Sequence, residues 1–334
     1  MLMINIIQIG MGPLGIKMAQ YISSRNGFET VAAVDLNPQL VGKPLQALSD
    51  ELGTSVQIEA NIENALASAT SRPQVALLTT VSDMVRITPQ IEAIVAAGIP
   101  VVSTCEELSF PWQEDAALAE RLDKAAKQAG VGIVGTGVNP GFLMDALPSF
   151  LTSVCQNVET VKVQRFQDAT SRRVPFQKKI GAGLTLDQFA DKVADGSLRH
   201  VGLSQSVQFI ADKLGWKLDK TEDIISPVIA EEAIEIPSMN IAKGQAAGVH
   251  QLGKGWVNGK VKILLEFQAA IGEAVSYDEV VVSGTPNVSS RIEGGVNGDI
   301  ATCAITINTI RPILQAQPGL HTMGTIPSSS FWEA

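Results

Sequence analysis

The chain has 334 residues, a length typical of two domains. Apolar residues make up 45% of it and charged residues 18%, which allows a large buried core and excludes global disorder. The formal net charge of -9 argues against a nucleic-acid or anionic-membrane surface, because both need concentrated Lys and Arg.

Short apolar runs alternate with helical patterns over the first part of the chain. We expect strands near 3–9, 30–35, 55–58, 74–79, 100–104 and 131–134. We expect helices near 13–24, 61–68, 86–97 and 114–128. This alternation predicts βαβ units and therefore a Rossmann-type α/β domain, a doubly wound parallel sheet.

A glycine loop follows the first predicted strand and opens the first predicted helix. Its residues are Gly10, Met11, Gly12, Pro13, Leu14 and Gly15. The spacing fits G-x-G-x-x-G, in which the first glycine allows a tight turn, the second lets backbone approach a pyrophosphate, and the third lets helix and strand pack closely. Unpaired N–H groups at the helix start would face the phosphates. The loop predicts a dinucleotide site; the alternative is a glycine-rich turn that binds no nucleotide.

Asp35 lies twenty residues after Gly15, at the end of the second predicted strand. A carboxylate there hydrogen-bonds the ribose hydroxyls of NAD and would repel the 2′-phosphate of NADP. No Arg follows Asp35, so NAD is favoured. Lys43 is the nearest cation and could reach the 2′-phosphate of a bound NADP. The simpler interpretation is that Lys43 is a surface lysine.

Small hydroxyl residues end the fourth and fifth predicted strands. They are Thr79, Thr80, Ser103 and Thr104. Because ligands bind beyond the carboxyl ends of strands in doubly wound sheets, these residues are candidate cofactor contacts, or else ordinary loop residues. Glu106 and Glu107 follow directly, and either carboxylate would be a general base or hold a substrate ammonium. The alternative is an acidic first helical turn.

Three further features are candidate substrate contacts. Asn139 lies in the loop 135–141, which joins the predicted domains and contains three glycines and a proline. Arg172 and Arg173 begin the densest basic stretch, and their guanidinium groups would bind a carboxylate. His200 would face a cleft. The competing interpretations are a plain hinge, a solvated strand or loop, and a structural histidine, respectively.

The pattern changes after about residue 135. A long strand is expected at 158–168, and helices near 184–195 and 203–215. Extended runs follow at 217–235, 246–253, 259–270 and 277–284, and a helix at 298–316. We therefore expect a Rossmann domain over 1–137, with 298–334 packing back onto it. A second α+β domain over 138–297, with a mixed or antiparallel sheet, would bind substrate and mediate oligomerisation.

The composition also bears on redox state, location and assembly. Three widely spaced cysteines, no CxxC and three histidines indicate neither a disulfide framework nor a metal site. We find neither a signal peptide nor a membrane span, so a cytoplasmic protein is expected. A homo-oligomer, with a dimer favoured, is expected because the strand-rich surface of the second domain needs covering.

Several stretches resemble 2,4-diaminopentanoate dehydrogenase and related native amine dehydrogenases, which share the fold of dihydrodipicolinate reductase. They are VVSTCEELSFPW (101–112), GTGVNPGFLMDALP (135–148), RRVPFQKKIGAG (172–183), HVGL (200–203), GVHQLGKG (248–255) and GDIATCAITINTIRPILQAQPGLHTM (298–323). Dihydrodipicolinate reductase itself matches less well, because the chain lacks that family's paired histidines.

The resemblance implies NAD(P)-dependent oxidative deamination of a small amine or diamino acid to a ketone and ammonia, or the reverse reaction. It implies that Glu106 or Glu107 binds the amine and acts as base, and that the arginine motif holds a substrate carboxylate. Gln205-Ser206 stands where the family often has Glu-Ser. The alternatives are a reductase of a cyclic imine or carbonyl, and a non-catalytic NAD(P)-binding sensor.

Overall fold

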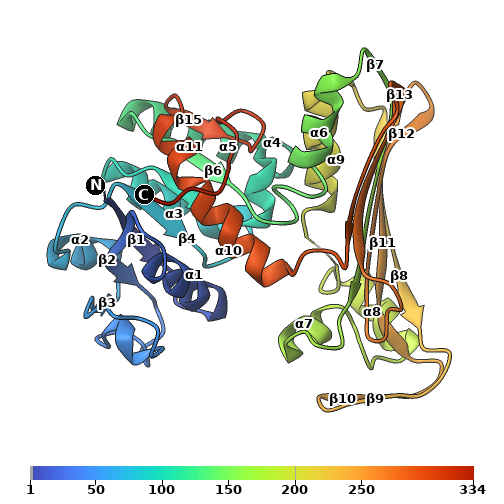
Figure 1. Ribbon diagram of the computed structural model, residues 1–334, viewed down its shortest axis with the longest axis horizontal. Helices are drawn as coiled ribbons and strands as arrows, with labels where there is room; N and C mark the ends of the chain where they lie inside the picture. Colours follow the sequence, from blue (N-terminus) through green and yellow to red (C-terminus); the bar gives the residue numbers. More distant parts are fainter. Residues whose placement is uncertain (1–2, 200) are drawn as a thin grey trace. The chain divides into compact units, whose positions relative to one another are not determined.

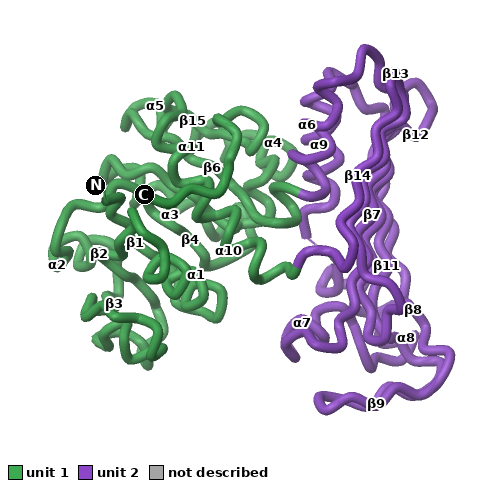
Figure 2. Tube along the Cα trace, in the orientation of Figure 1, with its two compact units in different colours: residues 1–142, 297–334 green, residues 143–296 purple. Residues whose placement is uncertain are grey.

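The structure is a computed structural model that describes residues 3–199 and 201–334. The chain forms two compact units: unit 1 contains residues 1–142 and 297–334, and unit 2 contains residues 143–296 (Figure 2). Unit 1 is therefore made from two separate parts of the sequence. The structure divides the chain at 142/143 and 296/297, where the sequence analysis placed the divisions at 137/138 and 297/298.

Unit 1 is built on a parallel sheet in the order β15-β6-β5-β4-β1-β2-β3. Its strands are β1 (Ile4–Ile9), β2 (Phe28–Val34), β3 (Ile58–Glu59), β4 (Val75–Leu78), β5 (Val101–Ser103), β6 (Gly132–Gly135) and β15 (Gly319–His321). The strand order reverses at β1, because β2 and β4 pair with its two sides. In doubly wound sheets, ligands bind beyond the carboxyl ends of the strands at such a reversal.

Helices cover both faces of this sheet (Figure 1). They are α1 (Pro13–Ser23), α2 (Ile62–Ser68), α3 (Met84–Ala96), α4 (Pro111–Glu114), α5 (Ala116–Ala129), α10 (Gly298–Asn308) and α11 (Ile310–Gln315), with 3-10 turns η1 (Leu45–Ala47) and η2 (Glu106–Ser109). One apolar cluster joins α3 and α5 to the sheet, and a second joins α1 and α10 to it. Burial on both faces explains why the strands are continuous apolar runs.

The predicted single helix over 298–316 is wrong. The helix α10 ends at Asn308, and α11 begins at Ile310. Pro312 has no N–H, and in a continuous helix its ring would collide with the carbonyl of Asn308. The break places Pro312 in the first turn of α11, where backbone N–H groups have no helical acceptor.

Unit 2 is built on a mixed sheet in the order β14-β13-β7-β12-β11-β8. Its strands are β7 (Asn157–Asp168), β8 (Lys220–Ile229), β11 (Ala246–Val257), β12 (Lys260–Ala270), β13 (Tyr277–Thr285) and β14 (Val288–Glu293). Neighbouring strands are antiparallel except for β7 and β12, which are parallel. A parallel sheet in unit 1 and a mixed sheet in unit 2 confirm the predicted fold class.

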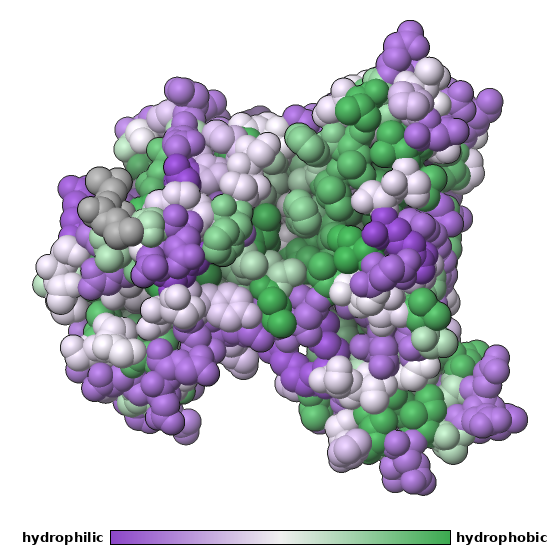
Figure 3. Space-filling view, in the orientation of Figure 1, coloured by the Kyte–Doolittle hydropathy of each residue, from purple (hydrophilic) through white to green (hydrophobic). Residues whose placement is uncertain are grey.

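Short helices and a hairpin complete unit 2. They are α6 (Ala146–Leu151), η3 (Thr152–Val154), α7 (Val174–Lys179), α8 (Leu186–Ala194), α9 (Leu203–Lys213) and the hairpin β9 (Ile234–Ile236) and β10 (Met239–Ile241). The helix α9 packs on two glycines of β11, because a Cβ at Gly253 or Gly255 would lie 2.9 Å from a side-chain atom of Leu203 or Val207. Around α6 the surface is largely apolar (Figure 3), and there Phe150 and Val154 are 67% and 70% exposed.

Candidate functional site

The glycine loop connects β1 to α1 as the motif requires. Gly10 has a φ of 97°, a left-handed conformation that strains any residue with a Cβ. A Cβ at Gly15 would lie 1.9 Å from the carbonyl oxygen of Gly10, so this position is closed to larger residues. A Cβ at Gly12 would meet no atom within 4 Å and would extend into open space. Gly12 is the N-cap of α1 and Pro13 follows at the first turn.

The carboxylate of Asp35 lies against this loop. Its Oδ2 accepts a hydrogen bond from the backbone N–H of Met11 at 2.6 Å, and its Oδ1 accepts one from Asn37 at 2.7 Å. Met11 itself is buried in a small apolar cluster with Ala19 and Leu45. The end of β2 is thus fastened to the loop, which places Asp35 beside the start of α1.

The four hydroxyl residues at the strand ends differ in their surroundings. Thr79 donates to the carbonyl of Gly10 at 2.9 Å and so supports the loop. Ser103 is fully buried; it donates to Leu78 at 3.1 Å and accepts from Cys105 at 3.1 Å. Thr80 is exposed and bonds Gln90, whereas Thr104 is half-buried. Thr79 and Ser103 therefore shape the sheet edge internally, and their contact with a cofactor stays a prediction.

Glu106 and Glu107 begin η2, immediately after β5. Both are half-buried. The Oε2 atom of Glu107 accepts the backbone N–H of Met84 at 2.7 Å, at the first turn of α3. A carboxylate is well placed there, since the start of a helix carries unpaired N–H groups and a positive dipole end. Glu107 therefore joins η2 to α3, and which of the two glutamates acts as base stays a prediction.

The end of strand β6 lies against η2 and leads into the loop that contains Asn139. A Cβ at Gly135 would lie 2.6 Å from the carbonyl oxygen of Leu108, so glycine permits this approach. Asn139 is half-buried and precedes Pro140 in a cis peptide bond. The hydroxyl of Thr136, which sequence reasoning missed, is buried without a hydrogen-bond partner in the described structure. Such an atom could bond a ligand, because buried polar groups are rarely left unsatisfied.

Arg172 and Arg173 lie in unit 2, before α7. The guanidinium of Arg172 stacks over the ring of Phe176 at 4.3 Å, and Arg173 is the N-cap residue of α7. This stretch is helical from Val174, where its alternative interpretation was a solvated strand or loop. His200 lies outside the described residues. The predicted cofactor residues thus belong to unit 1, and the two arginines to unit 2.

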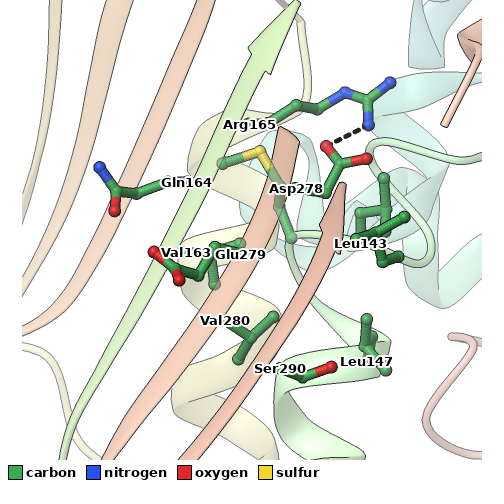
Figure 4. Close-up of a pocket in the computed structure, with 11 residues that line it drawn as sticks. Leu143, Leu147, Val163, Gln164, Arg165, Asp278, Glu279, Val280 and Ser290 are labelled. Carbon is green, nitrogen blue, oxygen red and sulfur yellow. Dashed lines mark hydrogen bonds and ion pairs between the residues drawn. The ribbon is translucent and has the colours of Figure 1, made fainter. Parts of the chain in front are cut away.

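A buried ion pair in unit 2 was also missed by sequence reasoning. Arg165 on β7 bonds Asp278 on β13 at 2.5 Å, and each residue is 4% exposed (Figure 4). Both side chains also bond the backbone of Val296, where the chain leaves unit 2. Burial lowers the pKa of Arg165, with a smaller lowering by Arg172, while Asp278 raises it. The two residues face each other on the neighbouring strands β7 and β13, which are far apart in the sequence, so the sequence carries no local signal for the pair.

The cavity beside this ion pair is too small to hold a substrate. Its volume is about 10 Å³, roughly the space of one water molecule, and Leu143, Leu147 and Val280 line it (Figure 4). Across residues 3–199 and 201–334, no group of three His, Cys, Asp or Glu side chains is arranged to hold a metal ion. None of the helices in this same part is long and apolar enough to span a bilayer.

The residues of the glycine loop fit a dinucleotide. Open space at Gly12, the closed contact at Gly15 and the carboxylate of Asp35 each match the part that the motif assigns to them. The first turn of α1, an eleven-residue helix, has no acidic side chain that would repel phosphate.

Comparison with known proteins places the chain in a family. The profile of the 2,4-diaminopentanoate dehydrogenase C-terminal domain matches residues 142–333, and that of a CoA binding domain matches residues 2–107. A 2,4-diaminopentanoate dehydrogenase of Acetoanaerobium sticklandii is 30% identical over 97% of this chain and 93% of its own length. The chain belongs to the 2,4-diaminopentanoate dehydrogenase family. The resemblance seen in the sequence is thereby confirmed.

Solved structures agree on the fold. An amine dehydrogenase from Mycobacterium smegmatis is similar with a TM-score of 0.84 and 20% identity, over 98% of this chain and 97% of that one. A dipicolinate-bound dihydrodipicolinate reductase from Paenisporosarcina sp. TG-14 is similar with a TM-score of 0.52 and 11% identity, over 97% and 99%. The family fold thus extends over both units.

Proposed function

We propose that the protein is an NAD(P)-dependent amine dehydrogenase that oxidises a small amine or diamino acid at the amine-bearing carbon. The observation that carries the proposal is the carboxylate pair at the end of β5, on the sheet edge that holds the glycine loop, in a chain of this family. The net reaction converts the protonated amine, water and NAD(P)⁺ to a ketone, ammonium, NAD(P)H and one proton.

Glu106 is our candidate for the base. Glu107 bonds the start of α3, so moving it would disturb a helix, and Glu106 is the neighbouring carboxylate at the end of β5. The carboxylate of Glu106 would hold the substrate ammonium and take one of its protons, then release it to solvent as the proton of the net reaction. Ionised again, it would accept a proton from the water that attacks the imine carbon and pass that proton to the departing nitrogen. Asn139, and the hydroxyl of Thr136, would hydrogen-bond the substrate or the cofactor amide.

The cofactor would be held by the glycine loop, Asp35 and the residues at the ends of β4 and β5. When bound, its nicotinamide ring supplies the hydride acceptor. Gly12 would let the backbone approach the pyrophosphate, and Asp35 would bond the ribose hydroxyls and disfavour a 2′-phosphate. We therefore propose NAD as the preferred cofactor over NADP.

Arg172 and Arg173 support a substrate that carries a carboxylate. They are consecutive residues at the start of α7, and the guanidinium of Arg172 stacks over the ring of Phe176. An added anion at Arg172 and Arg173 would gain bidentate, charge-assisted hydrogen bonds. His200 stays a candidate from the sequence for the same substrate.

The test is a panel of amines, diamino acids and amino ketones, assayed with NAD⁺ and NADP⁺ for reduced cofactor and released ammonia. We expect turnover of at least one amine, with a higher kcat/KM with NAD⁺. Turnover of a cyclic imine or a carbonyl without ammonia exchange would favour the reductase alternative. Cofactor binding without turnover of any compound would favour the sensor.

Replacing the two glutamates one at a time tests the base. We expect Glu106→Gln to lower kcat by about 100-fold or more, the usual contribution of a general base, while NADH binding persists. Glu107→Gln is the matched control and should chiefly lower thermal stability, because it weakens the bond to Met84. Full activity in Glu106→Gln would refute the assignment, and a loss confined to Glu107→Gln would move the role to that residue.

We also propose a homodimer formed through the open face of the sheet in unit 2, the face opposite α6 and α9. On this face Lys254 and Lys162 lie in one row of side chains, on either side of Leu264, and Glu266 and Glu279 lie in the next row, on either side of Gln164. At the ends of these rows, Glu222 lies beside Lys254, and Arg291 lies beside Glu279 and pairs with it at 3.7 Å. A two-fold axis running across the strands between these rows would place the central Lys162 over the partner's Glu266 and Glu279.

A further inference from the structure

The side-chain amide of Gln177, on α7, lies in the interior of unit 2. Gln177 is 1% exposed. Its Nε2 donates to the carbonyl of Ala169 at 3.0 Å and to that of Thr170 at 3.1 Å. Its Oε1 accepts from the hydroxyl of Ser238 at 2.8 Å. Both amide hydrogens and the amide oxygen are therefore bonded, which makes the group costly to replace.

These bonds close the bend that carries the two arginines. The carbonyl of Ala169 accepts from the backbone N–H of Arg172 at 3.1 Å as well as from Gln177. At the other end of the bend, the N–H of Gln177 itself donates to the carbonyl of Arg173 at 3.2 Å. The backbone before and after Arg172 is thus tied to one residue.

The same amide joins the bend to a distant segment. Ser238 lies in the turn between β9 and β10, 61 residues further along the chain. The start of the bend is fixed separately, since Thr170 bonds Asp168 at 2.6 Å and accepts from Gly272 at 3.0 Å. At the end of the bend, the carbonyl of Arg173 accepts from the N–H of Phe176 at 2.9 Å as well as from that of Gln177. The side chain of Gln177 adds the link to Ser238, so a change at Gln177 or Ser238 would loosen the bend near the arginines.

We propose that Gln177 is a positioning residue for substrate recognition: it holds Arg172 and Arg173 in place for a substrate carboxylate, and Ser238 braces it. The inference rests on the proposed function, in which these arginines bind that carboxylate. A guanidinium that is fixed before binding loses less conformational freedom on binding, so the brace raises affinity for anionic substrates selectively. An amine without a carboxylate gains little from it.

The test compares kcat/KM for a diamino acid with that for a carboxylate-free amine of similar length. Gln177→Met keeps the length and removes the amide, and Ser238→Ala removes only the brace to the hairpin. We expect the ratio of the two kcat/KM values to fall about tenfold in Gln177→Met, mainly through KM for the diamino acid, and about twofold in Ser238→Ala. Arg172→Ala in the same assay reports whether the arginine binds the carboxylate.

A second measurement needs no substrate. Trypsin cuts after arginine, so the rate of cleavage after Arg172 and Arg173, located by mass spectrometry, reports how firmly the bend is held. We expect faster cleavage there in Ser238→Ala and, if it folds, in Gln177→Met, with cleavage at Lys192 on α8 unchanged.

The outcomes separate the two proposals. An unchanged ratio in Gln177→Met or Ser238→Ala, with a lowered ratio in Arg172→Ala, would overturn the role of Gln177 alone. An unchanged ratio in Arg172→Ala would overturn the carboxylate site and the inference with it. If Gln177→Met does not fold, unchanged selectivity and unchanged cleavage in Ser238→Ala overturn the proposal.

Discussion

Gly12 and Gly15 are three residues apart, and the reasons for a glycine at the two positions differ. At Gly15 the limit is the folded chain itself, because the carbonyl oxygen of Gly10 occupies the position that a Cβ would take. At Gly12 the space is open and φ is -69°, which any residue adopts. The requirement at Gly12 would therefore come from a bound pyrophosphate rather than from packing.

Replacing glycine by alanine should therefore have a different effect at each of the two positions. Gly12→Ala should unfold at nearly the wild-type temperature but bind NADH about tenfold or more weakly, because the methyl group occupies the space for phosphate. Gly15→Ala should lose about 2 kcal/mol or more of stability through overpacking. Thermal unfolding and fluorescence titration with NADH measure the two effects. Unchanged NADH affinity in Gly12→Ala would contradict the phosphate site.

Cys105, which directly precedes the two glutamates, is predicted to be an unreactive thiol. Burial raises its pKa to about 12, and neighbouring Glu106 and Glu107 act in the same direction. A raised pKa keeps the thiol neutral at pH 8, and the thiolate is the reactive form. Iodoacetamide at pH 8 should therefore label the half-buried Cys155 before Cys105 and the buried Cys303. Peptide mapping checks this, and early labelling of Cys105 would contradict it.

Among the elements, the C-terminal segment illustrates how far apart the partners of one domain can lie in the sequence. The strand β15 pairs with β6 and adds an edge to the parallel sheet. The helix α11, which precedes β15, is separate from α10 because Pro312 interrupts the helical hydrogen bonds. After β15 the chain returns to the beginning of β2, where the ring of Trp332 meets Phe28 edge-on at a centroid distance of 5.2 Å. Arg25 donates to the carbonyl of Trp332 at 2.6 Å.

The contact between Trp332 and Phe28 predicts that the last residues of the chain stabilise the folded protein. Trp332→Ala should lower the free energy of unfolding by about 2 kcal/mol, less than for a fully buried tryptophan because Trp332 is half-buried. Phe331→Ala is a suitable control, since Phe331 is 71% exposed and should cost well under about 1 kcal/mol. Urea denaturation measures both. Equal losses in the two variants would show that the edge-on ring contact is not what matters.

For the whole molecule, the proposed dimer makes a prediction through charge. Lys162→Glu should weaken association, because each new carboxylate would face the partner's Glu266 and Glu279. Adding Glu266→Lys should restore it. Sedimentation should then give twice 35.4 kDa for the wild type and the double variant, and a lower mass for Lys162→Glu at the same concentration. If Lys162→Glu keeps the wild-type mass while Phe150→Ser lowers it, the apolar surface at α6 forms the interface instead.

The residues of the glycine loop show how much local sequence can reveal. The turn, the close packing and the exposed N–H groups all involve residues within one strand–turn–helix, so spacing alone predicted them, and Asp35 followed from the length of one βαβ unit. The alternating apolar runs predicted the parallel sheet, and short stretches such as VVSTCEELSFPW (101–112) predicted the family, for the same reason: each is a property of consecutive residues. The prediction of a single helix over 298–316 was wrong, because Pro312 breaks the helix although the apolar pattern continues through it.

The tertiary structure decided what depends on neighbours distant in the sequence. Glu106 and Glu107 are adjacent acids in the sequence, and only the structure shows that Glu107 accepts a bond from Met84, 23 residues earlier. Arg165 and Asp278 are 113 residues apart, and Gln177 and Ser238 are 61 apart, so no spacing rule links either pair. A carboxylate or an amide acquires its role from the groups that satisfy it, and burial brings those groups together from strands that pair across the whole chain.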